Sequence, residues 1–242
     1  MLSILKKELR TFFSNATGYV VIGIFLLLTG LFLWVIPGQY NILDAGYANV
    51  DGLFYLAPWL FLFLCPAVTM RLFAEEKQTG TWELLITKPI SKTQIVLGKF
   101  FAGWILVSLA TLPTLIYYFS VAYLAEPIGN IDSGAFWGSF IGLFFLSAIY
   151  VSIGSLASSL SNNQIIAFVV AMTLSFFFYY GFELLASFFS AGAPIQLLER
   201  IGVHAHYKSM SRGVIDSRDV VYFSLITIGF LFATVKMVSR KR

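Results

Sequence analysis

One stretch of the chain concentrates the residues that could bind a partner. Residues 71–99 read RLFAEEKQTGTWELLITKPISKTQIVLGK and form the most charged part of the sequence. Gly80 is suited to end a helix carrying residues 75–77, because glycine readily adopts the left-handed conformation found after helices. Residues 81–88 predict a second short helix, closed by Pro89. Because these roughly 28 residues far exceed the ~4–8 that a simple turn needs, we predict a docking surface rather than a solvated loop.

Other ionisable residues give weaker signals. Glu183 is the one acid within an apolar block, which makes it a candidate for gating or substrate contact. Glu183 lies ~27 Å from the start of its helix, which places it near the outer membrane interface. The alternative interpretation is a carboxylate that simply reaches water there. His204 and His206 would point ~200° apart on a helix, so a shared metal ion is not expected. Cys65 fits a small buried hydrophobic residue.

The sequence carries no recognisable catalytic constellation. No nucleophile accompanies a histidine and a carboxylate, and no cofactor is predicted. The nearest approach to a phosphate-binding P-loop is Gly98-Lys99, which is followed by Phe100 and has Thr93 where the first glycine must stand. A membrane enzyme would need polar clusters at one depth of the bilayer, and the apolar blocks contain none.

The composition indicates the elements that hold these residues. Of 242 residues, 58% are hydrophobic and only 12% are charged, whereas soluble domains carry about 25% charged residues. The apolar residues form blocks of roughly 18 to 26, and ~20 apolar residues cross the ~30 Å core of a bilayer. The net charge of +4 comes from basic residues at the block ends. These indicate membrane orientation, and nucleic-acid binding is not expected.

The blocks predict an all-α membrane protein with a single transmembrane domain over residues 1–242. Six spans are expected at about residues 17–36, 53–70, 100–124, 135–160, 165–189 and 220–238. Residues 1–16 predict an amphipathic helix lying at the membrane surface, with Leu2, Leu5, Leu9 and Phe12 on one face. A cleaved signal peptide is not expected, because the first block exceeds the usual ~7–15 residues and no clear cleavage site follows.

The basic residues also predict orientation. Twelve of the sixteen lie before span one, between spans two and three, or in the last turn of span six and after it. By the positive-inside rule both termini are therefore cytoplasmic. Residues 190–219 should then be external despite four basic residues, and they predict a re-entrant or interfacial pair of short helices. Pro194 would open the first helix and Gly213 would end the second.

A stripe of small residues marks the fourth block. Gly134, Gly138 and Gly142 recur every four residues, a pattern that lets helix backbones approach closely. We expect this stripe to pack within one subunit, with a subunit interface as the alternative.

The run Glu75-Glu76-Lys77-x-x-Gly80-Thr81-x-Glu83-Leu84-Leu85, followed by Thr87-x-Pro89 and Leu97-Gly98-Lys99, resembles the signature of type-2 ABC transporter permeases. Residues 155–164 are similar to the family's second cytoplasmic turn, and residues 1–16 to its elbow helix. Residues 211–223 are similar to a stretch in the permeases associated with bacterial gliding motility. Copper-enzyme maturation permeases share much of the pattern and remain an alternative.

The resemblance implies a bacterial inner-membrane permease subunit of an exporter-type complex, dimeric with itself or a paralogue, in contact with lipid, and driven by a separate cytoplasmic ATPase. The segment between spans two and three would be the coupling helix that docks on that ATPase. The implied docking residues are Glu75, Glu76, Lys77, Gly80, Thr81, Glu83, Leu84, Leu85, Asn162 and Asn163. A non-transporting scaffold coupled to an ATPase is a further alternative.

Overall fold

The computed structural model describes residues 1–188, 198 and 200–240, and within them the fold is entirely helical. The all-α prediction is therefore confirmed. The α-helices are α1 (Leu2–Ser14), α2 (Ala16–Gly30), α3 (Asp51–Thr69), α4 (Arg71–Gln78), α5 (Thr81–Ile86), α6 (Lys92–Thr111), α7 (Leu115–Leu124), α8 (Ser133–Leu160), α9 (Gln164–Phe176), α10 (Phe182–Ser187), α12 (Val203–Met210) and α13 (Ser217–Arg240). Short π-helical turns, Leu31–Val35 and Phe177–Gly181, extend α2 and α9, and a 3-10 turn, Leu112–Thr114, joins α6 to α7 at Pro113.

Six helical stretches in the described residues are long and apolar enough to cross a membrane, as predicted. They are Ala16–Val35, Asp51–Gln78, Lys92–Leu124, Ser133–Leu160, Gln164–Ser187 and Ser217–Arg240. The third starts well before the apolar block at residue 100, because the Ser91 side chain accepts a hydrogen bond from the Gln94 N–H and caps α6. The second continues past a turn at Met70 into α4.

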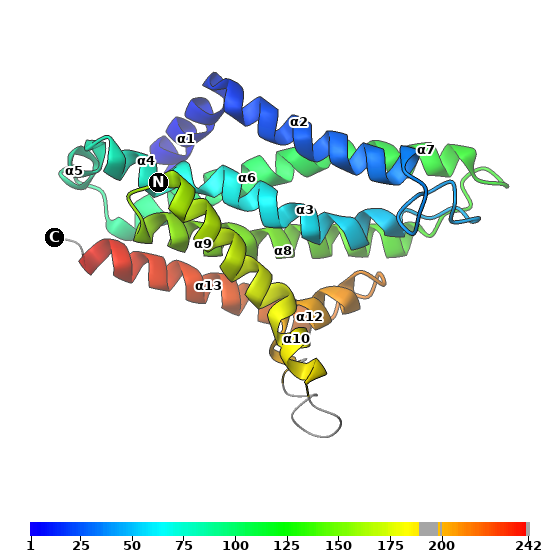
Figure 1. Ribbon diagram of the computed structural model, residues 1–242. Helices are drawn as coiled ribbons and strands as arrows, with labels where there is room; N and C mark the ends of the chain where they lie inside the picture. Colours follow the sequence, from blue (N-terminus) through cyan, green and yellow to red (C-terminus); the bar gives the residue numbers. More distant parts are fainter. Residues whose placement is uncertain (189–197, 199, 241–242) are drawn as a thin grey trace.

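Helix α8 forms the centre of the bundle. It packs against α3, α6, α9 and α13 (Figure 1), and its side chains Leu146, Ile149, Tyr150 and Ile153 are fully buried. The peripheral helices α2, α9 and α13 have mostly exposed faces. Those faces are apolar, as shown by exposed Ile24, Ile165 and Phe232. Exposing such an apolar surface to water would cost free energy, so these faces are suited to contact with lipid.

The bundle has two distinct ends. Both termini lie at the same end, together with α4 and α5, while α7 points to the opposite end (Figure 1). Of the two short helices predicted within residues 190–219, the first falls mainly outside the described residues. The second is α12, and the turn after it contains Gly213 in the left-handed conformation, with a φ of +82°.

Candidate functional site

The predicted docking segment folds into two short helices at the end of the bundle that holds both termini. Helix α4 ends at Gln78 and α5 begins at Thr81. Gly80 lies between them with a φ of +71°, in the left-handed conformation that other residues rarely adopt. Gly80 therefore reverses the chain as its position in the sequence predicted.

A buried ion cluster holds α4 to the rest of the bundle. Lys99 of α6 is fully buried, and its Nζ lies 2.8 Å from Glu8 Oε1 of α1 and 2.9 Å from Glu76 Oε2 of α4. The same amine donates to the Leu72 carbonyl at 2.5 Å and lies over the Phe73 ring. One lysine thus joins three helices that are far apart in sequence.

A second lysine completes this cluster. Lys7 Nζ lies 2.5 Å from Glu76 Oε1, so each oxygen of Glu76 faces one lysine. Burial lowers the pKa of Lys7, but hydrogen bonding and attraction to Glu76, with a smaller effect of Glu8, outweigh it and raise the pKa above its usual value. The two lysines and two glutamates balance in charge, which a buried ion cluster requires.

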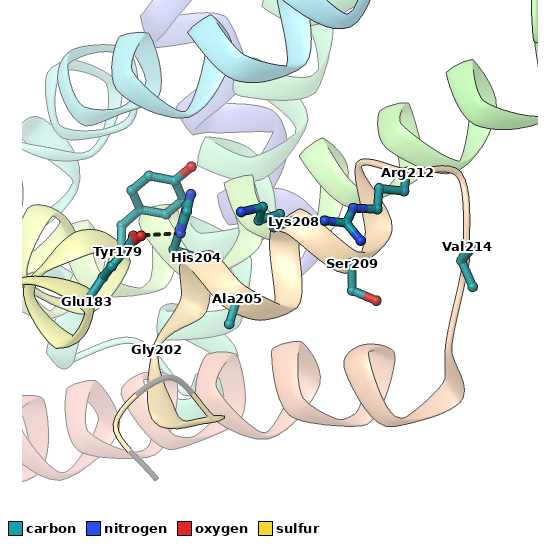
Figure 2. A pocket seen from close by; sticks show the side chains of 9 residues that line it. All are labelled: Tyr179, Glu183, Gly202, His204, Ala205, Lys208, Ser209, Arg212 and Val214. Carbon is teal, nitrogen blue, oxygen red and sulfur yellow. Dashed lines mark ion pairs between the residues drawn. The ribbon is translucent and has the colours of Figure 1, made fainter. Parts of the chain in front are cut away.

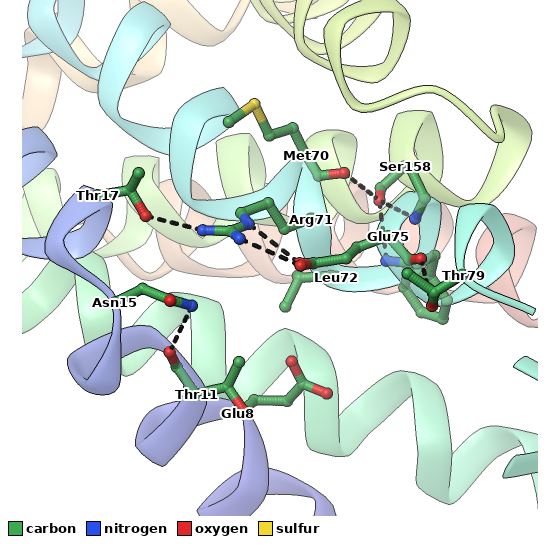
Figure 3. A network of polar contacts seen from close by, with 12 residues as sticks. Glu8, Thr11, Asn15, Thr17, Met70, Arg71, Leu72, Glu75, Thr79 and Ser158 are labelled. Atoms are coloured by element: carbon green, nitrogen blue, oxygen red, sulfur yellow. Dashed lines mark hydrogen bonds and ion pairs between the residues drawn. The ribbon is translucent and has the colours of Figure 1, made fainter. Parts of the chain in front are cut away.

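The start of α4 rests on a serine of α8. The Ser158 hydroxyl accepts hydrogen bonds from the backbone N–H groups of Phe73 and Ala74, at 3.0 and 3.1 Å, and donates to the Met70 carbonyl at 2.9 Å (Figure 3). The first N–H groups of a helix have no partner within the helix, so Ser158 supplies one from a neighbouring span. The turn at Met70 is thereby fixed against α8.

The other charged residues of α4 also have partners inside the chain. Arg71 binds Glu75 through two nitrogens, at 3.0 and 3.1 Å, and donates to the Thr17 hydroxyl at 2.8 Å (Figure 3). Lys77 donates to the Ser159 carbonyl. Of the predicted docking residues, Glu76 and Lys77 therefore contact other helices of this bundle, whereas Glu75 pairs with Arg71 of its own helix.

The remaining predicted docking residues divide by exposure. Leu85 is buried, whereas Gly80, Thr81, Glu83 and Leu84 are exposed. Asn162 and Asn163 are exposed in the turn between α8 and α9, where Asn163 caps α9 by accepting from the Ile165 N–H at 2.8 Å.

These two segments share one hollow, with a volume of about 590 Å³. Gly80 and Glu83 line it from the α4–α5 side, Asn162 from the α8–α9 turn and Lys92 from the start of α6. The structure thus brings together Gly80 and Asn162, which lie 82 positions apart in the sequence.

Glu183 lies in α10, and its side chain is 44% exposed. Its Oε2 is 2.7 Å from Nδ1 of His204 on α12. His206, on the same helix, instead contacts Asp219 at 2.7 Å through Nδ1 and the Arg200 carbonyl at 2.9 Å through Nε2. The two histidines therefore face different carboxylates, as their spacing on a helix predicts.

Two glycines of the predicted stripe lie where other chain comes very close. A Cβ on Gly138 would stand 2.6 Å from Gly213 Cα, and one on Gly142 would stand 3.1 Å from Met210 Cβ. Gly134 faces only the Asp132 carboxylate, at 3.4 Å. Gly138 and Gly142 thus pack against α12 and its following turn within this chain.

Sequence reasoning missed the residues that anchor the docking segment. Lys7 was counted only among the basic residues that indicate orientation, and Lys99 also appeared in the failed P-loop match and in the family resemblance. Glu8 was not singled out, and Ser158 lay only within the resemblance of residues 155–164. The available signal was charge balance: a lysine at the head of an apolar run requires a carboxylate when it is buried.

The six long apolar helices of the described residues define a multi-pass membrane protein. The chain belongs to the ABC-2 family of transporter proteins, whose model matches residues 36–236. It is also 29% identical over 192 residues to the probable ABC transporter permease protein NosY of Pseudomonas aeruginosa, an alignment that covers 75% of this chain and 68% of the relative. Together they support assignment as the transmembrane permease subunit of an ABC transporter.

Membership has two consequences for chemistry and assembly. Permease subunits of ABC transporters are not themselves enzymes, since ATP hydrolysis is carried out by a separate ATPase subunit. The family therefore implies an ABC ATPase as partner, and its permeases commonly form dimers.

Proposed function

We propose that this chain is the permease subunit of an exporter-type ABC complex in a bacterial inner membrane, with both termini in the cytoplasm. The observation that carries the proposal is the hollow lined by Gly80, Glu83 and Asn162 at the end that holds the termini. Twelve of the sixteen basic residues flank that end, which by the positive-inside rule is cytoplasmic. A cytoplasmic ATPase would then dock there.

The docking surface in this proposal is the exposed subset of the predicted residues. Gly80, Thr81, Glu83 and Leu84 would contact the ATPase from α5, with Asn162 and Asn163 contributing from the α8–α9 turn. Leu84 is 68% exposed, and a leucine so exposed at a polar end suits burial by a partner. The buried Glu76 and Leu85, together with Lys77, would hold α4 and α5 in position for docking, and Glu75 would keep Arg71 in place on α4.

Movement of the ATPase would pass into the spans through the same contacts. The ion cluster joins α4 to α1 and α6, and Ser158 joins α4 to α8. A push on α5 would therefore reach four helices at once. Tilting of those helices would alternate access to a path across the membrane. This transmission depends on the ion cluster and on the Ser158 hydrogen bonds, which join α4 to its neighbouring helices.

An apolar groove supports a bulky or lipidic cargo. It has a volume of about 330 Å³ and lies between α2, α3 and α9, where Phe25, Leu60, Leu64 and Phe168 are among its lining residues. A groove of this character suits hydrocarbon better than a hydrated ion, because an ion there would lose its water without gaining polar ligands.

Docking is tested by variants on the exposed face of α5. Glu83→Lys and Leu84→Asp should each lower the affinity for the co-expressed ATPase by about 10- to 100-fold, as removal of interface hot spots does. Both side chains are exposed, so thermal unfolding of the permease alone should stay unchanged. Affinity purification in mild detergent, with an ATPase assay, measures the association.

The matched control is Glu126→Lys, which reverses an exposed acid following α7, at the opposite end of the bundle. It should leave the association intact. If Glu83→Lys and Leu84→Asp both retained the ATPase at wild-type levels, the α5 surface would not be the docking site.

The cellular role in this proposal is gliding motility, supported by the resemblance of residues 211–223. Deletion of the gene should then abolish spreading over a surface while growth in liquid continues. A copper-enzyme maturation permease predicts the reverse pattern, with spreading intact and copper-enzyme activity lost. A scaffold that transports nothing predicts loss of function without any cargo accumulating in the mutant. Complementation with Glu83→Lys links either phenotype to ATPase docking.

A further inference from the structure

A cavity of about 440 Å³ lies between α10 and α12, away from the ATPase docking surface (Figure 2). Tyr179 and Glu183 line it from one side, and His204, Lys208 and Arg212 line it from α12 and the turn that follows. His204 and Lys208 are spaced four apart on one face of α12, and Arg212 follows them in the turn after the helix.

The charges in this cavity do not balance. Glu183 already contacts His204 at 2.7 Å. Burial lowers the pKa of His204, Glu183 opposes that shift, and Lys208 lowers the pKa further. Among the described residues no carboxylate lies within 4 Å of Lys208 or Arg212. Two cations and one carboxylate therefore leave one positive charge uncompensated.

Helix geometry alone does not account for this arrangement. One basic residue in the last turn of α12 complements the partial negative charge at the helix end. Arg212 is a second basic residue on the same cavity, and no acid of the described residues pairs with it, so it exceeds that need. Its position suits an anion that both side chains can reach.

The neighbouring space adds room for the rest of a ligand. A second cavity, of about 400 Å³, also has Tyr179, His204 and Lys208 in its lining and so adjoins the first. Its other walls are rich in aromatic rings, including Tyr55 and Trp59. A charged group held by Lys208 can thus carry an uncharged body that extends over these rings.

We propose that the cavity between α10 and α12 binds an anionic group, a phosphate or a carboxylate, through Lys208 and Arg212. The Lys208 ammonium supplies up to three donors as a point charge, and the Arg212 guanidinium supplies a planar fork that matches two oxygens of such a group. The Glu183 carboxylate repels the anion. Its contact with His204 holds this carboxylate on the opposite wall of the cavity. This site is independent of ATPase docking, and its ligand class goes beyond the proposed function.

Two probes separate the sources of such a group. Binding of inorganic phosphate to the protein in phosphatidylcholine nanodiscs is measured by calorimetry. Retention of phosphatidylglycerol relative to phosphatidylcholine of the same chain length is measured by native mass spectrometry of delipidated protein. A preference in the first identifies a soluble anion, and a preference in the second identifies a lipid headgroup.

The variants should change the affinity for the probe in opposite directions, whereas a structural defect would lower it in every variant. Lys208→Ala with Arg212→Ala should weaken binding of the preferred probe at least about tenfold, because both charge-assisted contacts are lost. Glu183→Gln should strengthen it by a few-fold, because a repelling charge is removed. Arg218→Ala, an exposed arginine of α13 that does not line the cavity, should leave it unchanged.

Circular dichroism and thermal unfolding check that each variant is folded. Should the double variant prove unfolded, Lys208→Gln and Arg212→Gln are measured singly, and each should weaken binding. The proposal is overturned if the wild type prefers neither probe, or if a folded double variant binds the preferred probe as the wild type does. It is equally overturned if Glu183→Gln weakens binding.

Discussion

Replacing Lys99 with methionine should lower the free energy of unfolding by about 3–5 kcal/mol, the range seen when one partner of a buried ion pair is removed. Methionine keeps much of the side-chain volume but removes the ammonium group that lies over the Phe73 ring. It removes the charge that faces Glu8 and Glu76, whose side chains are only 13% and 10% exposed. Thermal unfolding of the purified protein in detergent measures the loss.

Two further variants separate lost charge from lost packing. Adding Glu8→Gln to Lys99→Met restores the charge balance of the cluster and should recover part of the stability, a coupling that a double-mutant cycle quantifies. Lys88→Met removes an exposed lysine at the same end and should unfold like the wild type. A Lys99→Met protein with wild-type unfolding would show that the cluster does not anchor α1 and α4.

Replacing Gly138 with alanine should lower the free energy of unfolding by about 1–3 kcal/mol, as overpacking of a close contact does. The new Cβ would stand 2.6 Å from the Cα of Gly213. Gly213 cannot move away easily, because it is itself packed closely against Ala135 and its φ is +82°. The α8 backbone and the turn after α12 must therefore separate.

The effect is read against Gly229→Ala in α13, where a Cβ would meet nothing within 4 Å. That control should unfold at the wild-type temperature or slightly above it, since alanine favours helix over glycine. The contact fails as an explanation if Gly138→Ala and Gly229→Ala unfold alike.

The spans were predictable because the bilayer sets their length and composition. Each span needs ~20 apolar residues, and no competing fold buries six such blocks in water. Local signals also worked where one residue decides the backbone. Gly80 turns the chain between α4 and α5, and Ser91 caps α6, both as their residue types predict.

The docking segment was predictable as structured but not in its details. Charge and surface position favoured Glu75, Glu76 and Lys77 as contacts for a partner. The structure places Glu76 inside, because Lys7 and Lys99 come from helices that only the fold brings to it. A sequence gives no measure of which charges will meet across spans, so inward and outward residues of α4 could not be told apart.

Span two was expected to end at residue 70, where the helix break lies, but the residue that fixes this break escaped prediction for the same reason. The sequence there shows no helix breaker at the turn itself, and Pro66 lies within α3. What stabilises the turn is the Ser158 hydroxyl of a span 88 positions later in the chain, which binds the Met70 carbonyl. A short polar side chain within an apolar block thus had a partner that only the assembled bundle defines.

The Lys99 cluster also constrains the order in which the protein can be assembled during synthesis. Its carboxylates stand at positions 8 and 76, so both leave the ribosome before the lysine that neutralises them. Until residue 99 emerges, Lys7 is the only member of the cluster that can offset two acids. Helix α1 is therefore made before α6, yet it reaches its final contacts only when the third span enters the membrane.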